Sequence, residues 1–173
     1  MSVLSTVQLE KYADTLIWGL KTARPGFKKY DTILVRCDLE GRELGEILHR
    51  KLVQAKYNVV FRFMTSPLLE RDFYMYSDAA QRKFIAAGTG ELYKSLNGSV
   101  YIYAPSSLTH LKGIDTKRQS ETALAGRFLR DIMTKNEEQG KFGWTLCCYP
   151  TEELAKQARL SVKEYAAQIA KAC

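Results

Sequence analysis

The sequence has few metal-binding side chains and no long apolar run. Its two histidines, His49 and His110, lie far apart, and neither has a partner at the spacing of a zinc motif such as H-x-x-x-H. We expect His49 on the solvated face of a helix, beside two basic residues. No apolar stretch approaches the roughly 18 residues that span a bilayer, so a transmembrane helix is excluded.

The four cysteines include no C-x-x-C pair, and a disulfide framework is typical of much smaller secreted chains. We therefore expect four reduced thiols, with Cys37, Cys147 and Cys148 buried. The first residues lack the basic start and continuous apolar stretch of a signal peptide. Together these absences predict a cytoplasmic protein.

Phosphate-binding loops are missing as well. The chain contains no G-x-x-x-x-G-K-[ST] motif. Gly88 and Gly90 lie between predicted helical segments and not directly after a strand, so they do not form a dinucleotide fingerprint. Turn punctuation is the simpler interpretation of this pair.

The chain is rich in positive charge, with a net charge of +7. A basic protein suggests a nucleic-acid partner. The positive residues are scattered, however, and most fall beside acids or on polar helix faces. We therefore expect a solvated surface, with a nucleic-acid partner unlikely and no membrane partner. The apolar fraction of 46% and the charged fraction of 26% are those of a globular protein.

Hydrophobic patterning alternates between short strands and amphipathic helices. The strands are rich in β-branched residues, and the helices start at capping residues: Ser66, Ser77, Asp115, Thr151, and Ser161 with Glu164. We expect the helix after Asp115 to run unbroken to about Glu138. Its predicted buried side is Leu124, Phe128, Leu129, Ile132 and Met133. The predicted strands are 32–38, 59–65, 100–105 and 143–150, and the predicted helices include 7–23 and 39–57.

This alternation predicts a single α/β domain over residues 1–173. The expected architecture is three-layered: a mostly parallel sheet of four to five strands with helices on both faces, in a flavodoxin- or Rossmann-like arrangement.

Cys37 is the one isolated candidate for a nucleophile. It ends a predicted strand and precedes a predicted helix, where a helix dipole lowers the pKa of a thiol. Asp38 and Glu40 follow directly, and their negative charges favour the neutral thiol. A buried, unreactive side chain is therefore the simpler interpretation.

The order of four segments resembles a known family. A first helix containing LEKYADTLIWGL is followed by a Pro-Gly turn and DTILVRCDLEGRELGEILHRKLVQAKYNVV. Further on come LTHLKGIDTKRQSETALA and WTLCCYPTEELAKQARLSVKEYAAQIAKAC. Together these segments resemble the thermophilic-type metallo-aminopeptidases of the aminopeptidase T and aminopeptidase S group, and the resemblance covers nearly all 173 residues. The stretch around residues 66–84 is more aromatic and less acidic than this family leads us to expect.

The resemblance implies an activity that this chain does not carry alone. Members of the family are two-domain exopeptidases that remove N-terminal residues from peptides with two divalent ions of the zinc, cobalt or manganese class. Their ligands are Glu, His, Tyr and Asp residues of the C-terminal domain, and no position here matches them. We therefore expect an inactive N-terminal accessory domain without catalytic or metal-binding residues, its catalytic C-terminal domain absent from the chain. The implied partners are that domain, peptide substrates and a second copy in a homodimer.

Loops after parallel strands are where sites gather in open α/β sheets. On this rule we expect substrate access to be shaped by residues of the loops after the first, third and fourth strands: Asp38, Glu40, Ser106, Thr109, His110 and Thr151. Two alternatives stay open. One is a free-standing binding module whose basic surface takes protein or nucleic acid, and the other is a small enzyme that uses Cys37.

Overall fold

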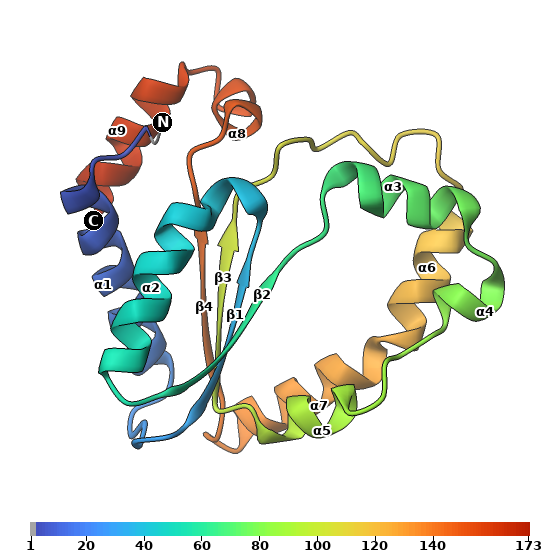
Figure 1. Cartoon of the computed structure of the whole chain (residues 1–173), viewed down its shortest axis with the longest axis horizontal. Helices are drawn as coiled ribbons and strands as arrows, with labels where there is room; N and C mark the ends of the chain where they lie inside the picture. The colour runs from blue at the N-terminus through green and yellow to red at the C-terminus, as the bar shows by residue number, and fades with distance from the viewer. Residues whose placement is uncertain (1–2) are drawn as a thin grey trace.

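The computed structural model describes residues 3–173 as one parallel sheet surrounded by helices (Figure 1). Within these residues the sheet has four strands in the order β2-β1-β3-β4, and every neighbouring pair is parallel. The predicted α/β class and parallel sheet are confirmed, and the order matches the first four strands of a flavodoxin-like sheet. The strands are β1 (Thr32–Cys37), β2 (Asn58–Phe63), β3 (Gly98–Tyr103) and β4 (Gly143–Cys148).

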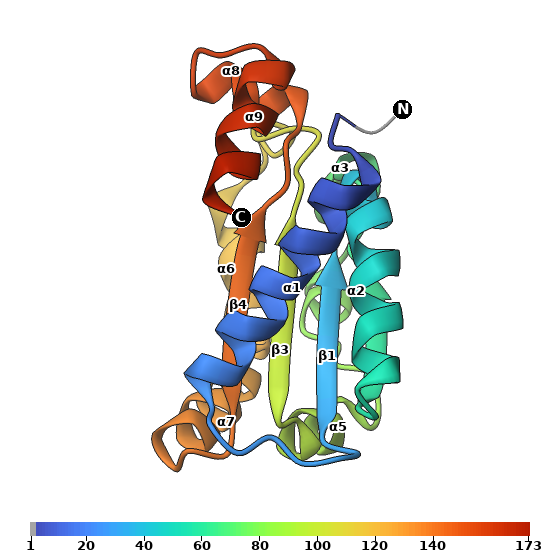
Figure 2. The same ribbon diagram turned by 90° about the vertical axis from the view of Figure 1, so that its left-hand side faces the viewer.

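Two long helices cover one face of the sheet (Figure 2). Their buried leucines pack against the inward-facing side chains of the central strands and form the main hydrophobic core. The first helix begins at a capping box between Ser5 and Gln8, in which each side chain accepts the other residue's backbone N–H. The elements are α1 (Thr6–Ala23), the 3₁₀ turn η1 (Leu39–Gly41) and α2 (Arg42–Gln54).

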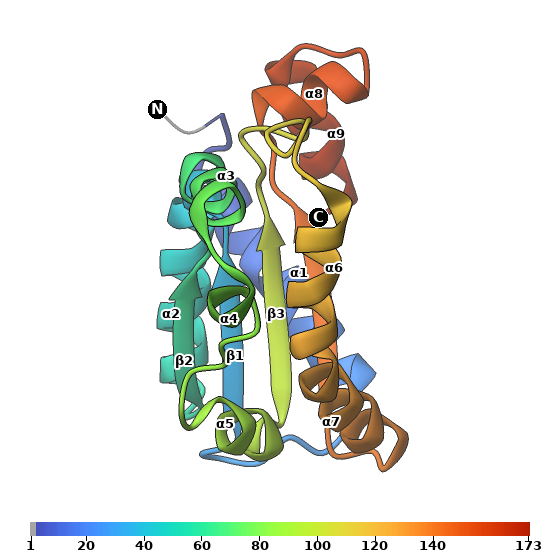
Figure 3. The same ribbon diagram turned by 90° about the vertical axis from the view of Figure 1, so that its right-hand side faces the viewer.

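The opposite face is covered by helices only in part. A small second core of Leu34, Leu96 and Phe142 lies near the amino ends of the strands, with two helices beside it. Three further helices arch away from the carboxyl ends of the strands, and β3 is visible between them in Figure 3. We call these three helices the arm. The two near helices are α5 (Thr89–Ser95) and α7 (Arg127–Glu138), and the arm is α3 (Pro67–Tyr76), α4 (Ala79–Arg82) and α6 (Thr116–Ala125).

Polar contacts hold the arm together. Arg82 is buried between α4 and α6, where its Nε donates to Glu121 Oε2 at 2.8 Å and its Nη1 donates to the carbonyl of Ser77. Arg118 of α6 donates to the carbonyls at the end of α3, 2.7 Å from Tyr74 O. None of the three arm helices buries an apolar side chain fully. The arm therefore depends on charge-assisted hydrogen bonds, not on a core of its own.

The chain ends in two short helices beside the main core. Thr151 caps the first, and Ser161 with Glu164 forms the predicted capping box of the second. Ala166 of the second helix lies in the main core cluster. No helix within residues 3–173 has the length and apolar character needed to cross a bilayer. The two helices are α8 (Glu152–Gln157) and α9 (Val162–Ala172).

The segment between Ser66 and Glu138 departs most from expectation. The predicted long helix is broken at Gly126 into α6 and α7. Leu124 is exposed because the arm has no core of its own, and Phe128 stays 42% exposed although its ring lies near Gly90 of α5. Asp78, not Ser77, caps α4, since Ser77 ends α3. Gly88 adopts φ +78° and precedes α5, a conformation that glycine takes without strain. Gly90, which we expected in a turn between two helical segments, lies inside α5.

Burial of the thiols and of one histidine follows the prediction except at one position. Cys37 and Cys147 are buried, and His49 is exposed on α2. Cys148 is only half-buried, because it points to the partly covered face of the sheet while its neighbour faces α1.

Candidate functional site

Two cavities lie at the edge of the sheet where the parallel strands end. The first, of about 350 Å³, is lined by the loops after β1, β2 and β3 together with the start of α3. The second, of about 970 Å³, is lined by the loops after β1 and β4 and by the first turns of α8 and α9. We call this part of the molecule the carboxyl edge. It is where ligands bind in open α/β sheets.

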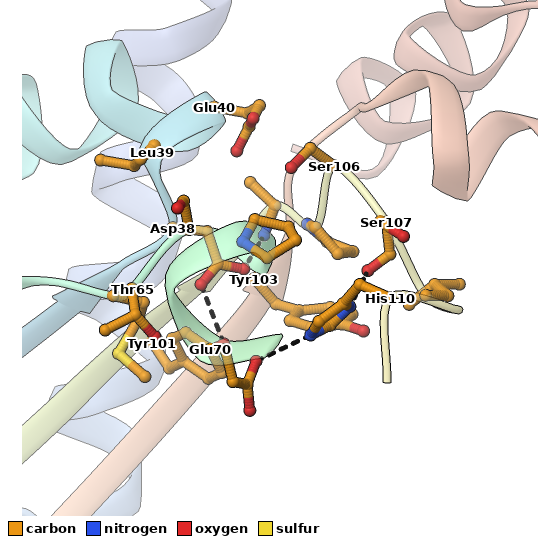
Figure 4. A pocket seen from close by; sticks show the side chains of 16 residues that line it. Asp38, Leu39, Glu40, Thr65, Glu70, Tyr101, Tyr103, Ser106, Ser107 and His110 are labelled. Atoms are coloured by element: carbon orange, nitrogen blue, oxygen red, sulfur yellow. Dashed lines mark hydrogen bonds and ion pairs between the residues drawn. The ribbon is translucent and has the colours of Figure 1, made fainter. Parts of the chain in front are cut away.

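Asp38 joins two loops of the carboxyl edge. It follows β1 directly, and its carboxylate accepts a hydrogen bond from the backbone N–H of Ala104 at 2.7 Å and from the hydroxyl of Tyr101 at 3.1 Å (Figure 4). Burial of the phenol, together with the negative charge of Asp38, raises the pKa of Tyr101 above its usual value. Tyr101 therefore stays a neutral donor, and Asp38 fixes the loop after β3 against the loop after β1.

His110 and Glu70 form a second pair in the first cavity. The Nε2 atom of His110 lies 2.8 Å from Glu70 Oε2, and its Nδ1 atom lies 3.1 Å from the carbonyl oxygen of Ser107. Both ring nitrogens of His110 therefore lie within hydrogen-bond distance of an oxygen atom. Figure 4 shows the pair bridging the loop after β3 and the helix α3. The contact between His110 and Glu70 fixes one wall of the cavity.

Glu40 and Ser106 line both cavities. Both are exposed, Glu40 in η1 and Ser106 in the loop after β3. Gly41 follows Glu40 and lies close to β3: a Cβ atom there would be 2.6 Å from Cγ2 of Ile102. The glycine lets the turn that carries Glu40 sit directly on the end of the sheet.

Of the two remaining predicted residues, Thr151 lines a cavity and Thr109 does not. Thr151 lines the second cavity, but it is buried, and its Oγ1 accepts the backbone N–H of Leu154 as the cap of α8. Thr109 lines neither of these two cavities, and its backbone N–H donates to Ser107 Oγ. The structure therefore brings five of the six predicted residues to the carboxyl edge cavities. That they shape substrate access stays a prediction.

Sequence reasoning missed several residues of the first cavity, among them Glu70, Tyr101 and Tyr103. The tyrosines alternate along β3, and this period of two was the signal that both point to one face of the sheet. Glu70 carried no such signal, because its partner His110 is 40 positions away and meets it only through the fold of the arm.

The carboxyl edge does not fit a divalent metal ion. No three His, Cys, Asp or Glu side chains in residues 3–173 are grouped closely enough to hold one. The oxygens of Asp38 are used by Ala104 and Tyr101, and Glu70 is paired with His110. We therefore assign no metal-dependent step to these residues.

Cys37 is unsuited to nucleophilic chemistry. Its side chain is fully buried under α2, and burial, with the nearby carboxylate of Asp38, raises the pKa of the thiol to about 12. A reactive cysteine needs an accessible thiolate near neutral pH. The buried-residue interpretation of Cys37 therefore holds.

Replacing Asp38 with alanine tests its structural role. We expect a loss of about 1–3 kcal/mol in the free energy of unfolding, because the buried N–H of Ala104 loses its acceptor. Urea unfolding measures the loss, and hydrogen exchange should show faster exchange of the Ala104 amide. The matched control is Glu40→Ala, two residues on and exposed, which should stay within about 0.5 kcal/mol of the parent chain. Equal stability of the two variants would contradict the assigned role.

Comparison with known proteins places this geometry in context. Residues 5–173 match the family described as thermophilic metalloprotease (M29). Among solved structures, wild-type AmpT from Thermus thermophilus is similar, with a TM-score of 0.69 at 15% sequence identity. The match covers 96% of this chain and 42% of that chain, so this chain spans less than half the length of its structural relative. No curated protein matches. At this identity the structural likeness establishes the fold alone.

Proposed function

Since this chain belongs to the thermophilic metalloprotease (M29) family, we propose that it is the N-terminal accessory domain of a two-domain metallo-aminopeptidase. The observation that carries the proposal is the family match over residues 5–173. Members of a metalloprotease family cleave peptide bonds with the help of protein-bound metal ions. The similar solved structure is more than twice as long as this chain, which leaves room for a second, catalytic domain.

The proposal puts the divalent ions in the second domain. A pair of zinc, cobalt or manganese ions would activate water there. The chain described here contributes walls and hydrogen bonds. Its described residues hold no metal-binding cluster, and its carboxyl edge is already cross-linked by Asp38 and by the contact of Glu70 with His110. Rigid walls of this kind suit a domain that limits which peptides reach a neighbouring centre.

The proposed contact with peptide is the carboxyl edge. Glu40 and Ser106 are exposed polar groups, and each borders both cavities. The carboxylate of Glu40 attracts the positively charged amino terminus of an approaching peptide. The proposed partners are therefore peptide substrates and the catalytic domain of the same protein, with a homodimer as the assembly of the full-length enzyme.

The first experiment separates the two domains. The purified 173-residue chain should release no amino acid from peptides, whereas the product of the reading frame continued beyond Cys173 should release N-terminal residues in a chelator-sensitive reaction. Chelator-sensitive release by the 173-residue chain alone would overturn the proposal. A continued reading frame that encodes no hydrolase activity would do the same.

The second experiment tests the carboxyl edge in the longer protein. We expect Glu40→Gln to raise KM for short peptides about five-fold, the factor that corresponds to ~1 kcal/mol of lost charge attraction. The matched control is Glu91→Gln, because Glu91 is also exposed but lies on α5 at the opposite end of the strands. Steady-state kinetics over a series of peptide lengths measures both. If Glu40→Gln and Glu91→Gln behave alike at every length, the carboxyl edge does not face the substrate.

A further inference from the structure

The partly covered face of the sheet carries an unusual set of side chains. We call it the open face, and its strand residues include Arg36, Arg62, Tyr101, Trp144 and Leu146. Arg36 is the register neighbour of Arg62 on β2 and of Tyr101 on β3, so these three side chains form a row across the sheet. Trp144 is 53% exposed and Leu146 is 48% exposed, although both lie on a strand. A sheet face of this composition is available to a ligand.

A third cavity, of about 230 Å³, lies on the open face between β3, β4 and α7. Its wall includes Arg36, Ser99, Tyr101, Arg130 and Trp144. The guanidinium of Arg36 lies over the ring of Tyr101, with 5.1 Å from its central carbon to the ring centroid. The cavity therefore combines two guanidinium groups with the rings of Tyr101, Phe142 and Trp144.

Polar atoms in this cavity lack hydrogen-bond partners. Ser99 is only 2% exposed, and its Oγ has no partner within residues 3–173. The Nε atom of Arg36 is buried in the same way, also without an acceptor in that part of the chain. A buried polar group without a partner costs free energy, so a ligand that supplies an acceptor here gains more than it would at the surface.

The positive charge of the open face is also unbalanced. Among the described residues, neither Arg36, Arg62 nor Arg130 has an acidic side chain within 4 Å. Arg36 and Arg62 are direct neighbours in the sheet, and like charges in that position destabilise it. One acid, Glu137, also lines the cavity, and its carboxylate accepts a hydrogen bond from Trp144 Nε1 at 3.1 Å. An anionic group bound beside Arg36 would relieve this repulsion.

Tyr101 connects the basic cavity to the acidic one. It lines both the cavity beside Arg36 and the first cavity of the carboxyl edge, which holds Asp38, Glu40 and Glu70. The path along β3 from Ser99 to Tyr103 covers four residue steps, or about 13 Å. An extended peptide of about four residues has this length. The surface is positive at one end and negative at the other. Its charges therefore complement those of a free peptide, which has a carboxylate at one end and an ammonium group at the other.

We propose that the cavity beside Arg36 binds the C-terminal carboxylate of a short peptide whose chain runs over Tyr101 toward the carboxyl edge. The carboxylate accepts hydrogen bonds from the guanidinium of Arg36 and from the hydroxyl of Ser99. Trp144 covers the last side chain, and the peptide's ammonium end lies near Glu40. The inference rests on the proposed function and adds to it a preference for short peptides with a free carboxylate.

Binding to the 173-residue chain tests the proposal without any activity assay. Trp144 is a direct fluorescent reporter when Trp18, exposed on α1, is replaced by phenylalanine in every variant. The probes are tetra-alanine with a free carboxylate and tetra-alanine amide. We expect the free acid to bind at least about ten-fold more tightly, because charge-assisted hydrogen bonds are lost in the amide.

Two variants and one control locate the effect. Arg36→Gln should remove the preference for the acid, and so should Arg130→Gln, an exposed position on α7 whose replacement leaves the sheet intact. The control is Arg127→Gln, an exposed arginine on the same helix as Arg130 that lines none of the three cavities, which should keep the full preference. Circular dichroism confirms that each variant is folded.

Three results would overturn the proposal: equal affinity for acid and amide, equal loss in Arg127→Gln and Arg36→Gln, or displacement of the peptide by inorganic phosphate or oligo-dT at the peptide's own affinity. The last would indicate a general anion or nucleic-acid surface. Each of these leaves the proposed function standing, because that depends on chelator-sensitive release by the longer protein. Conversely, failure of that release assay leaves the binding result unchanged.

Discussion

Raising the pH from 9 to 11 should destabilise this chain by about 4 kcal/mol, because two buried thiols resist ionisation in the folded state. Burial raises the pKa of Cys37 to about 12 and that of Cys147 to about 12, from an ordinary thiol value of about 9. Cys37 is fully buried, and Cys147 is 6% exposed. Both thiols are therefore more acidic in the unfolded chain than in the folded one.

The sign follows from proton binding. Below pH 9 both thiols are neutral in the folded and the unfolded chain, so the stability they contribute is fully present. As the pH rises above 9, the unfolded chain loses these protons while the folded chain keeps them, and the free energy of unfolding falls until about pH 12. Each thiol contributes a slope of about 0.7 kcal/mol per pH unit at pH 9, where half of the unfolded thiols are ionised, and about 1.4 kcal/mol per pH unit from about pH 10 to 11. The raised pKa of Lys51, caused by hydrogen bonds to Asp14 and Glu10, acts in the same direction.

Urea unfolding at intervals from pH 8 to 11, in the presence of a reducing agent, measures this slope. Cys37→Ala should remove one thiol's share of it, about 1.4 kcal/mol per pH unit, whatever its effect on stability at pH 8. A stability that stays level from pH 8 to 11 would mean that these thiols ionise as readily in the folded chain as in the unfolded one. The same slope in Cys37→Ala as in the parent chain would assign the effect to other groups.

The second large effect concerns the two faces of the sheet. Leu48→Ala should cost about 2–5 kcal/mol, because Leu48 is fully buried between α2 and the sheet and its loss leaves a cavity. Leu146→Ala removes the same atoms from the open face, where Leu146 is half-exposed, and should cost under about 1 kcal/mol. The comparison holds the chemistry constant and changes only the side of the sheet.

Chemical denaturation of both variants at pH 7 is the measurement. A large difference would show that the stability of the chain resides on the side of α1 and α2. Similar losses would mean that the open face is packed in solution by a contact that the isolated chain makes there. That result would also remove the surface on which we place the peptide carboxylate.

Much of the fold was predictable because its signals are local. The capping serines, threonine and aspartate and the β-branched strands fix where most elements begin, and the alternation of strand and helix fixes the parallel sheet. The error at Leu124 and Phe128 has a physical cause. Helical periodicity identifies an apolar stripe, but it does not tell whether another layer lies against it. At Leu124, in the arm, that layer is missing; at Phe128, on α7, the neighbouring α5 covers the side chain only in part; and Gly126 allows the helix to break.

The candidate site was predictable only at the level of loops. The strand-end rule pointed to the loops of Asp38, Ser106 and Thr151 because it depends on topology alone. The partners that give these loops their shape, such as Glu70 for His110, come from segments whose meeting depends on the tertiary fold. The arginines of the open face were visible in the sequence, but their lack of acidic neighbours is a property of the sheet register.

The strand order also has a kinetic consequence. The central pairing of the sheet joins Ile33 to Gly98, and at least one helix lies in the chain between the two strands of every pair. Contacts this distant in sequence carry a large loop-closure entropy, and chains dominated by them fold slowly. During synthesis β1 can therefore pair only with β2 until β3 has left the ribosome. Until then the apolar edge of β1 stays open, and chaperone binding at that stage is the expected protection.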